Sequence, residues 1–133
     1  MKFNLDDLNP GAFFPFEDNE ESDDKGGVTV RLANGKIIAN IDKKCTKKSV
    51  KYHRNQRHEV IEEDDELRSQ MLWDYVITDW VGLEDNEGQE IPCTKENKIK
   101  LMQGSVKFSG FVGNCVEQLT ADSDMYDEKL EKN

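Results

Sequence analysis

The clearest β-strand pattern of hydrophobic positions lies in the first third of the chain. Residues 28–32 and 36–41 are two runs rich in β-branched side chains, and Asn34-Gly35 lies between them. Asn-Gly at this place favours a two-residue type I′ turn, because both central residues of that turn need positive φ. The pattern therefore predicts a β-hairpin over residues 28–41.

The hairpin is preceded by residues 1–27, which we expect to form a flexible segment, aromatic at first and then acidic. Three phenylalanines lie within Phe13–Phe16, and six of the eight residues from 17 to 24 are acidic. A lone hairpin is barely stable in water, so it must pack on helices or pair with a further strand. Either Phe13–Phe16 or Lys51–Tyr52 could supply that third strand.

Further along the chain the apolar residues recur at spacings of three and four, which indicates amphipathic helices. The first helix begins at Asp64, ends near Gly82, and carries one apolar face made of Leu67, Met71, Leu72, Tyr75, Val76 and Trp80. Thr94 is the expected N-cap of a short second helix over Lys95–Met102, which Gly104 ends. The cleanest stripe belongs to a third helix and consists of Phe108, Phe111, Val112, Cys115, Val116 and Leu119.

Together these elements predict an α+β fold, an N-terminal β-hairpin or small antiparallel sheet packed on about three α-helices. The 133 residues form one domain, with residues 64–119 as the helical part and 120–133 as an acidic, partly disordered tail. Residues 43–63 show little periodicity and are expected mostly as loop, and Gly110 and Gly113 indicate close approach by another helix or backbone. The expected core consists of Val28, Val30, Leu32, Ile37, Ile41, Leu67, Met71, Leu72, Tyr75, Val76, Trp80, Leu101, Phe108, Phe111, Val112, Val116 and Leu119.

Composition and charge exclude several classes of function. Apolar residues make up 35% of the chain, charged residues another 35%, and the net charge is −10, which argues against direct nucleic-acid binding. No apolar run approaches the length of a membrane span, and a signal-peptide core is missing, so we expect a cytoplasmic protein without membrane contact. The charge is segregated: seven basic and no acidic residues lie in Lys43–Arg57, and six of the eight residues in Glu59–Glu66 are acidic.

Residues capable of chemistry do not form a recognisable catalytic set. His53 and His58 lie in a strongly basic segment without a paired acid or nucleophile. Their spacing from Cys45 and Cys93 does not match a zinc motif, and the acidic turn at residues 84–88 lacks the ligand spacing of a calcium loop. Three cysteines, an odd number without a CxxC pair, fit reduced thiols. We therefore expect no catalytic residue, no metal and no cofactor, and a protein that is not an enzyme.

The candidate binding residues are aromatic and apolar. Trp73 and Trp80 lie seven residues apart on the predicted helix, and they are either large core fillers or anchors of a protein contact. The proposed partner-binding face joins them to the last stripe and consists of Trp73, Trp80, Phe108, Phe111 and Val112. The same residues would serve equally well as core.

The segment that follows this helix carries short motifs that resemble the tail assembly chaperones of long-tailed bacteriophages and prophages. Members of that family carry a D-W-x-G helix end, a D-x-x-G turn, an I-P step, an E-N helix start and a Phe-rich helix. The matching residues here are 77–83, 85–88, 91–94, 96–98, 101–102 and 108–116.

This resemblance implies a protein that binds the long, aggregation-prone tape measure protein until the tail tube polymerises, with self-association as one way of doing so. High net charge and apolar helix faces fit the same class. The alternative is an acidic inhibitor that mimics DNA, and the net charge of −10 supports this class. The basic block 43–57 argues against it, because a mimic needs a continuous negative face.

Overall fold

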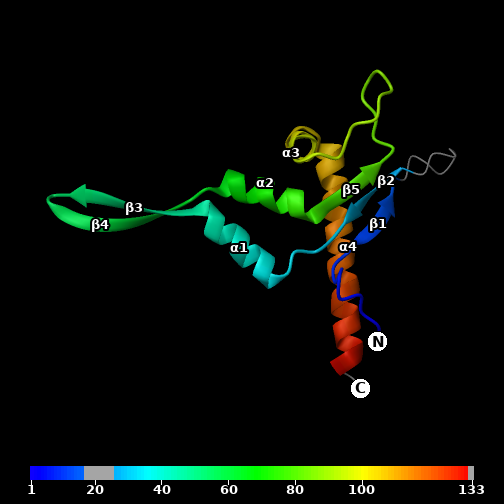
Figure 1. Ribbon diagram of the computed structural model, residues 1–133, viewed down its shortest axis with the longest axis horizontal. Coiled ribbons are helices and arrows are strands. Elements are labelled where there is room, and N and C mark those ends of the chain that lie inside the picture. The colour runs from blue at the N-terminus through cyan, green and yellow to red at the C-terminus, as the bar shows by residue number, and fades with distance from the viewer. Residues whose placement is uncertain (17–25, 132–133) are drawn as a thin grey trace.

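The computed structural model describes residues 1–16 and 26–131, with side chains as far as Ser123. It confirms an α+β fold with two small antiparallel sheets and four helices (Figure 1). The elements in chain order are β1 (Ala12–Pro15), β2 (Gly27–Val30), α1 (Gly35–Cys45), β3 (Thr46–His53), β4 (Gln56–Glu63), α2 (Asp65–Val76), β5 (Ile77–Val81), α3 (Lys95–Gly104) and α4 (Val106–Glu131).

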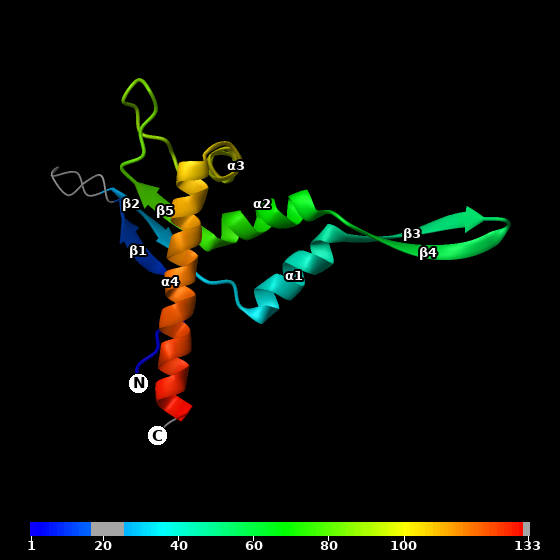
Figure 2. The same cartoon turned by 180° about the vertical axis from the view of Figure 1, so that it is seen from behind.

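A three-stranded sheet with the order β1-β2-β5 forms the centre of the body, which comprises this sheet, α3 and α4. Both strand pairs are antiparallel: Val28 lies opposite Phe14 on one side and opposite Trp80 on the other. The first of the two candidate third strands is thus confirmed, since β1 overlaps the aromatic run Phe13–Phe16. Helix α4 runs along the sheet (Figures 1 and 2) and closes a core of Val28, Val30, Ile77, Trp80, Phe108, Val112 and Cys115.

The predicted hairpin over residues 28–41 is wrong in its second half. Strand β2 ends at Val30, and the segment expected as the returning strand is α1. Asn34 acts as the N-cap of this helix rather than as a turn residue, because its side chain accepts a 3.0 Å hydrogen bond from the Ile37 main-chain N–H. Ile41 and Cys45 recur at a spacing of four and are buried, so packing overrides the β-propensity of the isoleucines.

The first predicted helix is shorter than expected. Helix α2 ends at Val76, and Ile77–Val81 continues as β5, so Trp80 lies on a strand and not on the helix that carries Trp73. Three consecutive β-branched residues, from Val76 to Thr78, disfavour further helix. Ile77 is fully buried opposite Val30 of the neighbouring strand.

The segment expected mostly as loop, residues 43–63, contains a long hairpin. Strands β3 and β4 pair over eight positions, from Thr46 opposite Glu63 to His53 opposite Gln56. Arg54 and Asn55 in the turn have φ of 50° and 64°. The two positive φ values that a type I′ turn requires are therefore found here and not at Asn34-Gly35.

Helices α1 and α2 lie side by side and carry the β3–β4 hairpin away from the body (Figures 1 and 2). We call residues 35–76 the arm. Arg68 of α2 forms an ion pair with Asp42 of α1. At the base of the hairpin the Asp64 N–H donates to the Cys45 carbonyl at 2.8 Å.

Two further helices lie close to their predicted positions. Thr94 caps α3, with its Oγ1 accepting from the Asn97 N–H at 3.2 Å, as predicted. Helix α4 contains the Phe-rich stripe but continues to Glu131, so the expectation of a partly disordered tail is wrong through that residue. A Cβ at Gly110 or Gly113 would meet no atom of the described residues within 4 Å, so the predicted close approach is wrong for that part of the chain. The acidic run 17–24 lies outside the described residues.

Candidate functional site

Three residues of the predicted partner-binding face belong to the core of the body. Trp80, Phe108 and Val112 expose only 3%, 7% and 3% of their surface. The Trp80 and Phe108 rings meet edge to face with centroids 5.8 Å apart, an arrangement that stabilises buried aromatic pairs. In the folded chain these three side chains stabilise the fold and do not present a surface to a partner.

The other two residues of that face are half-buried and lie on different elements. Phe111 of α4 packs against Phe16, with ring centroids 5.1 Å apart, and so covers the core cluster at its edge. Trp73 lies on α2 in the arm and is not among the described residues that pack on that cluster. The five predicted residues therefore do not form one exposed face.

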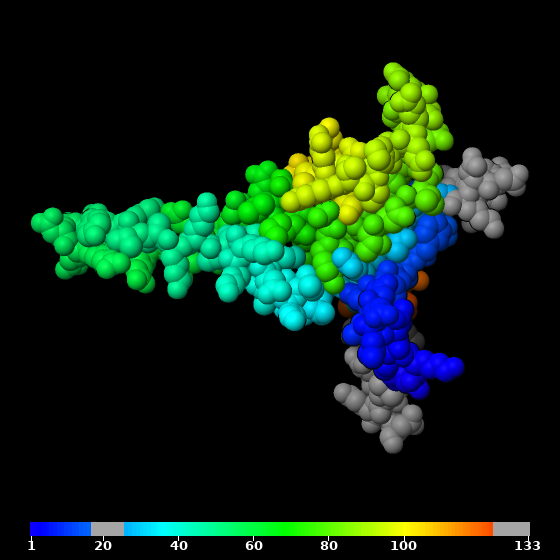
Figure 3. All heavy atoms as spheres, viewed as in Figure 1, coloured from blue at the N-terminus to red at the C-terminus, as the bar shows by residue number. Residues whose placement is uncertain are grey.

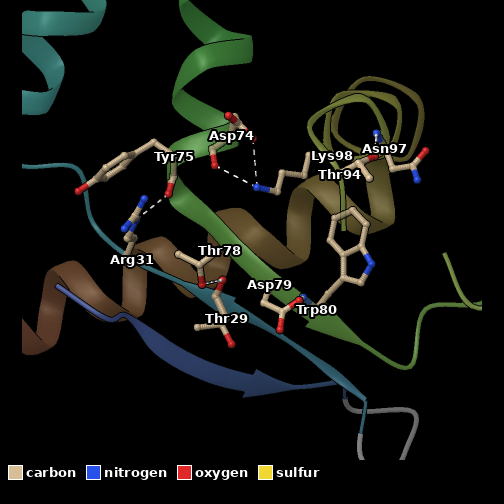
Figure 4. A network of polar contacts seen from close by, with 10 residues as sticks. All are labelled: Thr29, Arg31, Asp74, Tyr75, Thr78, Asp79, Trp80, Thr94, Asn97 and Lys98. Carbon is tan, nitrogen blue, oxygen red and sulfur yellow. Dashed lines mark hydrogen bonds and ion pairs between the residues drawn. The ribbon is translucent and has the colours of Figure 1, made fainter. Parts of the chain in front are cut away.

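The motifs that carry the family resemblance form a network of structural contacts, for which Figure 4 shows the Trp80 and Asn97 side chains. The Trp80 indole Nε1–H donates to the Ile91 carbonyl at 2.7 Å, and the Asn97 side-chain amide donates to the Pro92 carbonyl at 2.9 Å. The D-W, I-P and E-N motifs thus bind the loop that follows β5 to the sheet at one end and to α3 at the other. Their role is to hold the body together.

A second part of the same network fixes the junction between arm and body (Figure 4). Lys98 of α3 is buried, and its Nζ donates to both the side chain and the main-chain carbonyl of Asp74 at 3.1 Å. Arg31 follows β2; its Nε donates to the Tyr75 carbonyl at 2.8 Å, and its guanidinium lies 3.8 Å from the centre of the Tyr75 ring. These contacts at the end of α2 set the direction in which the arm leaves the sheet.

The acidic turn after β5 is a turn stabilised by its own carboxylate. Asp85 Oδ1 accepts from the Glu87 N–H at 2.9 Å and from the Gln89 N–H at 3.0 Å, and Gly88 supplies positive φ at 78°. A carboxylate engaged in this way fixes the loop. Among the described residues no group of three or more His, Cys, Asp or Glu side chains could hold a metal ion.

A cavity of about 340 Å³ lies at the base of the hairpin, where α1, α2 and both strands meet. Two of its four acidic residues have side-chain partners: Asp42 pairs with Arg68, and Asp64 Oδ1 accepts from the Leu67 N–H at 3.0 Å as the N-cap of α2. These two contacts hold α1 and α2 at the place where the hairpin begins. The cavity is lined by Asp42, Cys45, Thr46, Glu63, Asp64, Asp65 and Arg68.

Exposed apolar side chains gather on the hairpin at the tip of the arm. Val50, Tyr52 and Ile61 expose 42%, 74% and 62% of their surface. Val50 and Tyr52 are two residues apart on β3, and Ile61 lies opposite Lys48, so all three lie on one face of the hairpin. We call these three residues the tip face; Figure 3 shows how far the hairpin that carries them extends from the body.

Sequence reasoning missed this face because residues 43–63 show little periodicity and are expected mostly as loop. The available signal was a strand-like spacing, with Val50 and Tyr52 two apart and Val60-Ile61 as a second short run. A second exposed apolar group lies in the N-terminal segment and consists of Met1, Phe3, Leu5 and Leu8.

Burial makes two of the free thiols, Cys93 and Cys115, weakly reactive. Burial raises the pKa of both Cys93 and Cys115 above the ordinary value of 9.0, and for Cys93 the nearby Lys98 ammonium opposes the effect. A thiol of raised pKa carries little thiolate near neutral pH and is a poor nucleophile.

The fold thus defines a small α+β protein that carries three exposed apolar side chains on a projecting arm. Residues 29–133 match the family described as YdaY prophage protein, and the chain belongs to that family. The match begins within β2 and includes the arm, α3 and α4. No curated protein and no solved structure matches the chain. None of the described helices has the length and apolar character needed to cross a membrane.

Proposed function

We propose that this prophage protein is a non-enzymatic assembly chaperone of phage tails that binds the tape measure protein during tail morphogenesis. The single observation that carries the proposal is the tip face, three exposed apolar side chains on an arm that a polar network holds away from the body. A chaperone of a helical, aggregation-prone protein needs apolar surface that its own core does not use. The net charge of −10 keeps such a protein soluble.

The sequence motifs add support of a different kind. The D-W, I-P and E-N motifs shared with tail assembly chaperones form the network that joins the loop after β5, α3 and the end of α2. These motifs therefore support a common scaffold, on which the arm supplies the contact with the partner.

The alternative of a DNA mimic receives no specific support from the described residues. The basic strand β3 lies beside the acidic strand β4, with Lys47 opposite Glu62, and Lys51 forms a 3.2 Å ion pair with Glu62. Positive and negative groups thus alternate across the hairpin, whereas a mimic needs an uninterrupted negative face.

Co-expression with the long coiled-coil protein encoded nearby in the same prophage tests the proposal. We expect that protein to become soluble only with this chain and to copurify with it. The variant Ile61→Asp should abolish both effects, because it replaces one of the three apolar side chains of the tip face by a charge. Val106→Asp is the matched control: Val106 is 88% exposed, is also β-branched and lies on the body.

Circular dichroism of both variants verifies that the fold is retained. The proposal fails if the coiled-coil protein stays insoluble, or if the two variants rescue its solubility equally well. The second outcome would place the contact elsewhere than on the arm.

A further inference from the structure

The β3–β4 hairpin has two free edges, and they carry opposite charge. The sheet contains only these two strands among the described residues, so each strand pairs on one edge and leaves the other open. An open edge presents unpaired N–H and C=O groups that can pair with another strand. Apart from contacts between its own strands, the hairpin meets the rest of the arm mainly where β3 follows α1.

The charges on the two strands decide which edges can meet. Strand β3 carries Lys47, Lys48 and Lys51 and no acidic residue, whereas β4 carries Glu59, Glu62 and Glu63 against one Arg57. Two β3 edges would place lysines beside lysines, and two β4 edges would place glutamates beside glutamates. Like charges directly across strands are destabilising and opposite charges are stabilising.

We propose that copies of this chain associate through their hairpins, the β3 edge of one copy pairing with the β4 edge of the next. If the pairing repeats the register found within the hairpin, Lys47 lies opposite Glu62 of the neighbouring copy and Ser49 opposite its Val60. In an antiparallel sheet every second residue of a strand points its N–H and C=O towards one neighbouring strand, and the residues between them point theirs to the other side. In the register proposed here, the outward-pointing residues of β3 lie opposite those of the neighbouring β4, so their N–H and C=O groups can pair.

Such an assembly has a definite symmetry. Each copy uses two different edges, so the contact is heterologous and generates a ring or an open array rather than a two-fold dimer. The tip faces of successive copies would lie on the same side of the growing sheet, where the apolar residues alternate with Lys48, Arg57 and Glu59. This self-association follows from the geometry and charge of the hairpin edges and does not depend on the identity of the proposed partner.

Sedimentation of the purified full-length chain, in the presence of a reductant, provides the first test. At low salt the mass should rise with protein concentration beyond twice that of the monomer, and at high salt it should return towards the monomer because exposed charges are screened. A chain that stays monomeric at every concentration in low salt, or whose mass stops at the dimer, overturns the proposal.

A charge-swapped chain provides the sharper test. Lys47, Lys48 and Lys51 are changed to Glu, and Glu59, Glu62 and Glu63 to Lys, so opposite charges still face one another within the hairpin and the net charge is unchanged. This chain should assemble with itself as the native chain does. It should not assemble with the native chain, because both mixed edge pairs then have like charge.

Energy transfer between chains labelled at the N-terminal amine measures whether native and charge-swapped chains assemble with one another. We expect transfer among native chains and among swapped chains, and loss of transfer to background between the two. Equal transfer in the mixed sample would show that charge on the hairpin edges does not select the partner, and would overturn the proposal. Circular dichroism of the swapped chain verifies that the fold is retained, and failure of a folded swapped chain to assemble with itself would count against the proposal in the same way.

Discussion

The Trp80 indole and the Ile91 carbonyl are joined by a 2.7 Å hydrogen bond that spans eleven residues of chain. Trp80 lies on β5 in the centre of the core, and Ile91 lies at the end of the loop that leads to α3. One side chain therefore fills the core and closes the loop at the same time. This double role explains why a D-W motif and an I-P motif occur together in the sequence.

Replacing Trp80 separates the two roles. Trp80→Phe keeps most of the apolar contact with Phe108 but removes the donor to the Ile91 carbonyl, and we expect a loss of about 1–3 kcal/mol in the free energy of unfolding. Trp80→Ala also leaves a cavity and should cost about 3–5 kcal/mol. Guanidinium unfolding followed by circular dichroism measures both. Equal losses for the two variants would contradict a separate contribution from the hydrogen bond.

Elements whose local sequence pattern is compatible with one structure only could be predicted from the sequence. Thr94 has a side chain that caps the helix it precedes, and the stripe from Phe108 to Leu119 can satisfy its apolar spacing only as a helix. Both elements are found where the pattern places them. In each case local propensity and tertiary packing favour the same structure.

Segments in which local propensity and tertiary packing favour different structures could not be predicted. Asn34 is as good a helix cap as a turn residue, and the choice depends on burial of Ile41 and Cys45. Trp80 fits the helical spacing of α2, but pairing of β5 with β2 decides its backbone. Three of the five predicted partner-binding residues, Trp80, Phe108 and Val112, are buried for the same reason, because the most apolar side chains are also the best core residues.

Lys98 should contribute more to stability than an exposed lysine on the same helix. Lys98→Met keeps the aliphatic stem but leaves the Asp74 carbonyl and carboxylate without the Nζ donor. Because the Asp74 side chain is 40% exposed and can be hydrated, the expected cost is about 1–2 kcal/mol. Lys100→Met removes a 3.1 Å pair with Glu96 that lies at the surface, and should cost no more than about 0.5 kcal/mol.

Thermal or denaturant unfolding of these two variants makes the comparison. Similar losses would show that the Lys98 contact stabilises the junction between arm and body no better than a surface ion pair does. A larger loss for Lys98→Met, with protease sensitivity appearing near the end of α2, would agree with the role assigned to it.

Two glycines with nearly equal φ should respond differently to alanine. Gly82 has φ of 76° and Gly88 has φ of 78°, so both substitutions incur the strain of the left-handed region, about 1–2 kcal/mol. A Cβ at Gly82 would also lie 2.7 Å from the Gly26 Cα, whereas a Cβ at Gly88 would meet no atom within 4 Å in the described part of the chain. We therefore expect Gly82→Ala to cost about 3 kcal/mol or more and Gly88→Ala only the strain. Equal denaturation midpoints would contradict the predicted contact with Gly26.

Cys93 should react slowly with alkylating reagents in the folded chain, and the rate should rise only at alkaline pH. Burial raises the pKa of this thiol above 9.0, so the reactive thiolate is scarcer than in the unfolded chain at the same pH. The matching effect on stability has a definite sign: the folded state binds the proton more tightly, so the stabilisation is complete below pH 9.0 and is lost as the pH rises through the raised pKa.

Iodoacetamide labelling followed by peptide mass spectrometry measures the rate at Cys93 across the pH range, in native and denatured protein. Lys98→Met serves as the paired variant, because the Lys98 ammonium lowers the pKa of Cys93 and its removal should shift the labelling profile to still higher pH. A native rate equal to the denatured rate near neutral pH would contradict the burial of the thiol. An unchanged profile in Lys98→Met would show that the ammonium does not act on it.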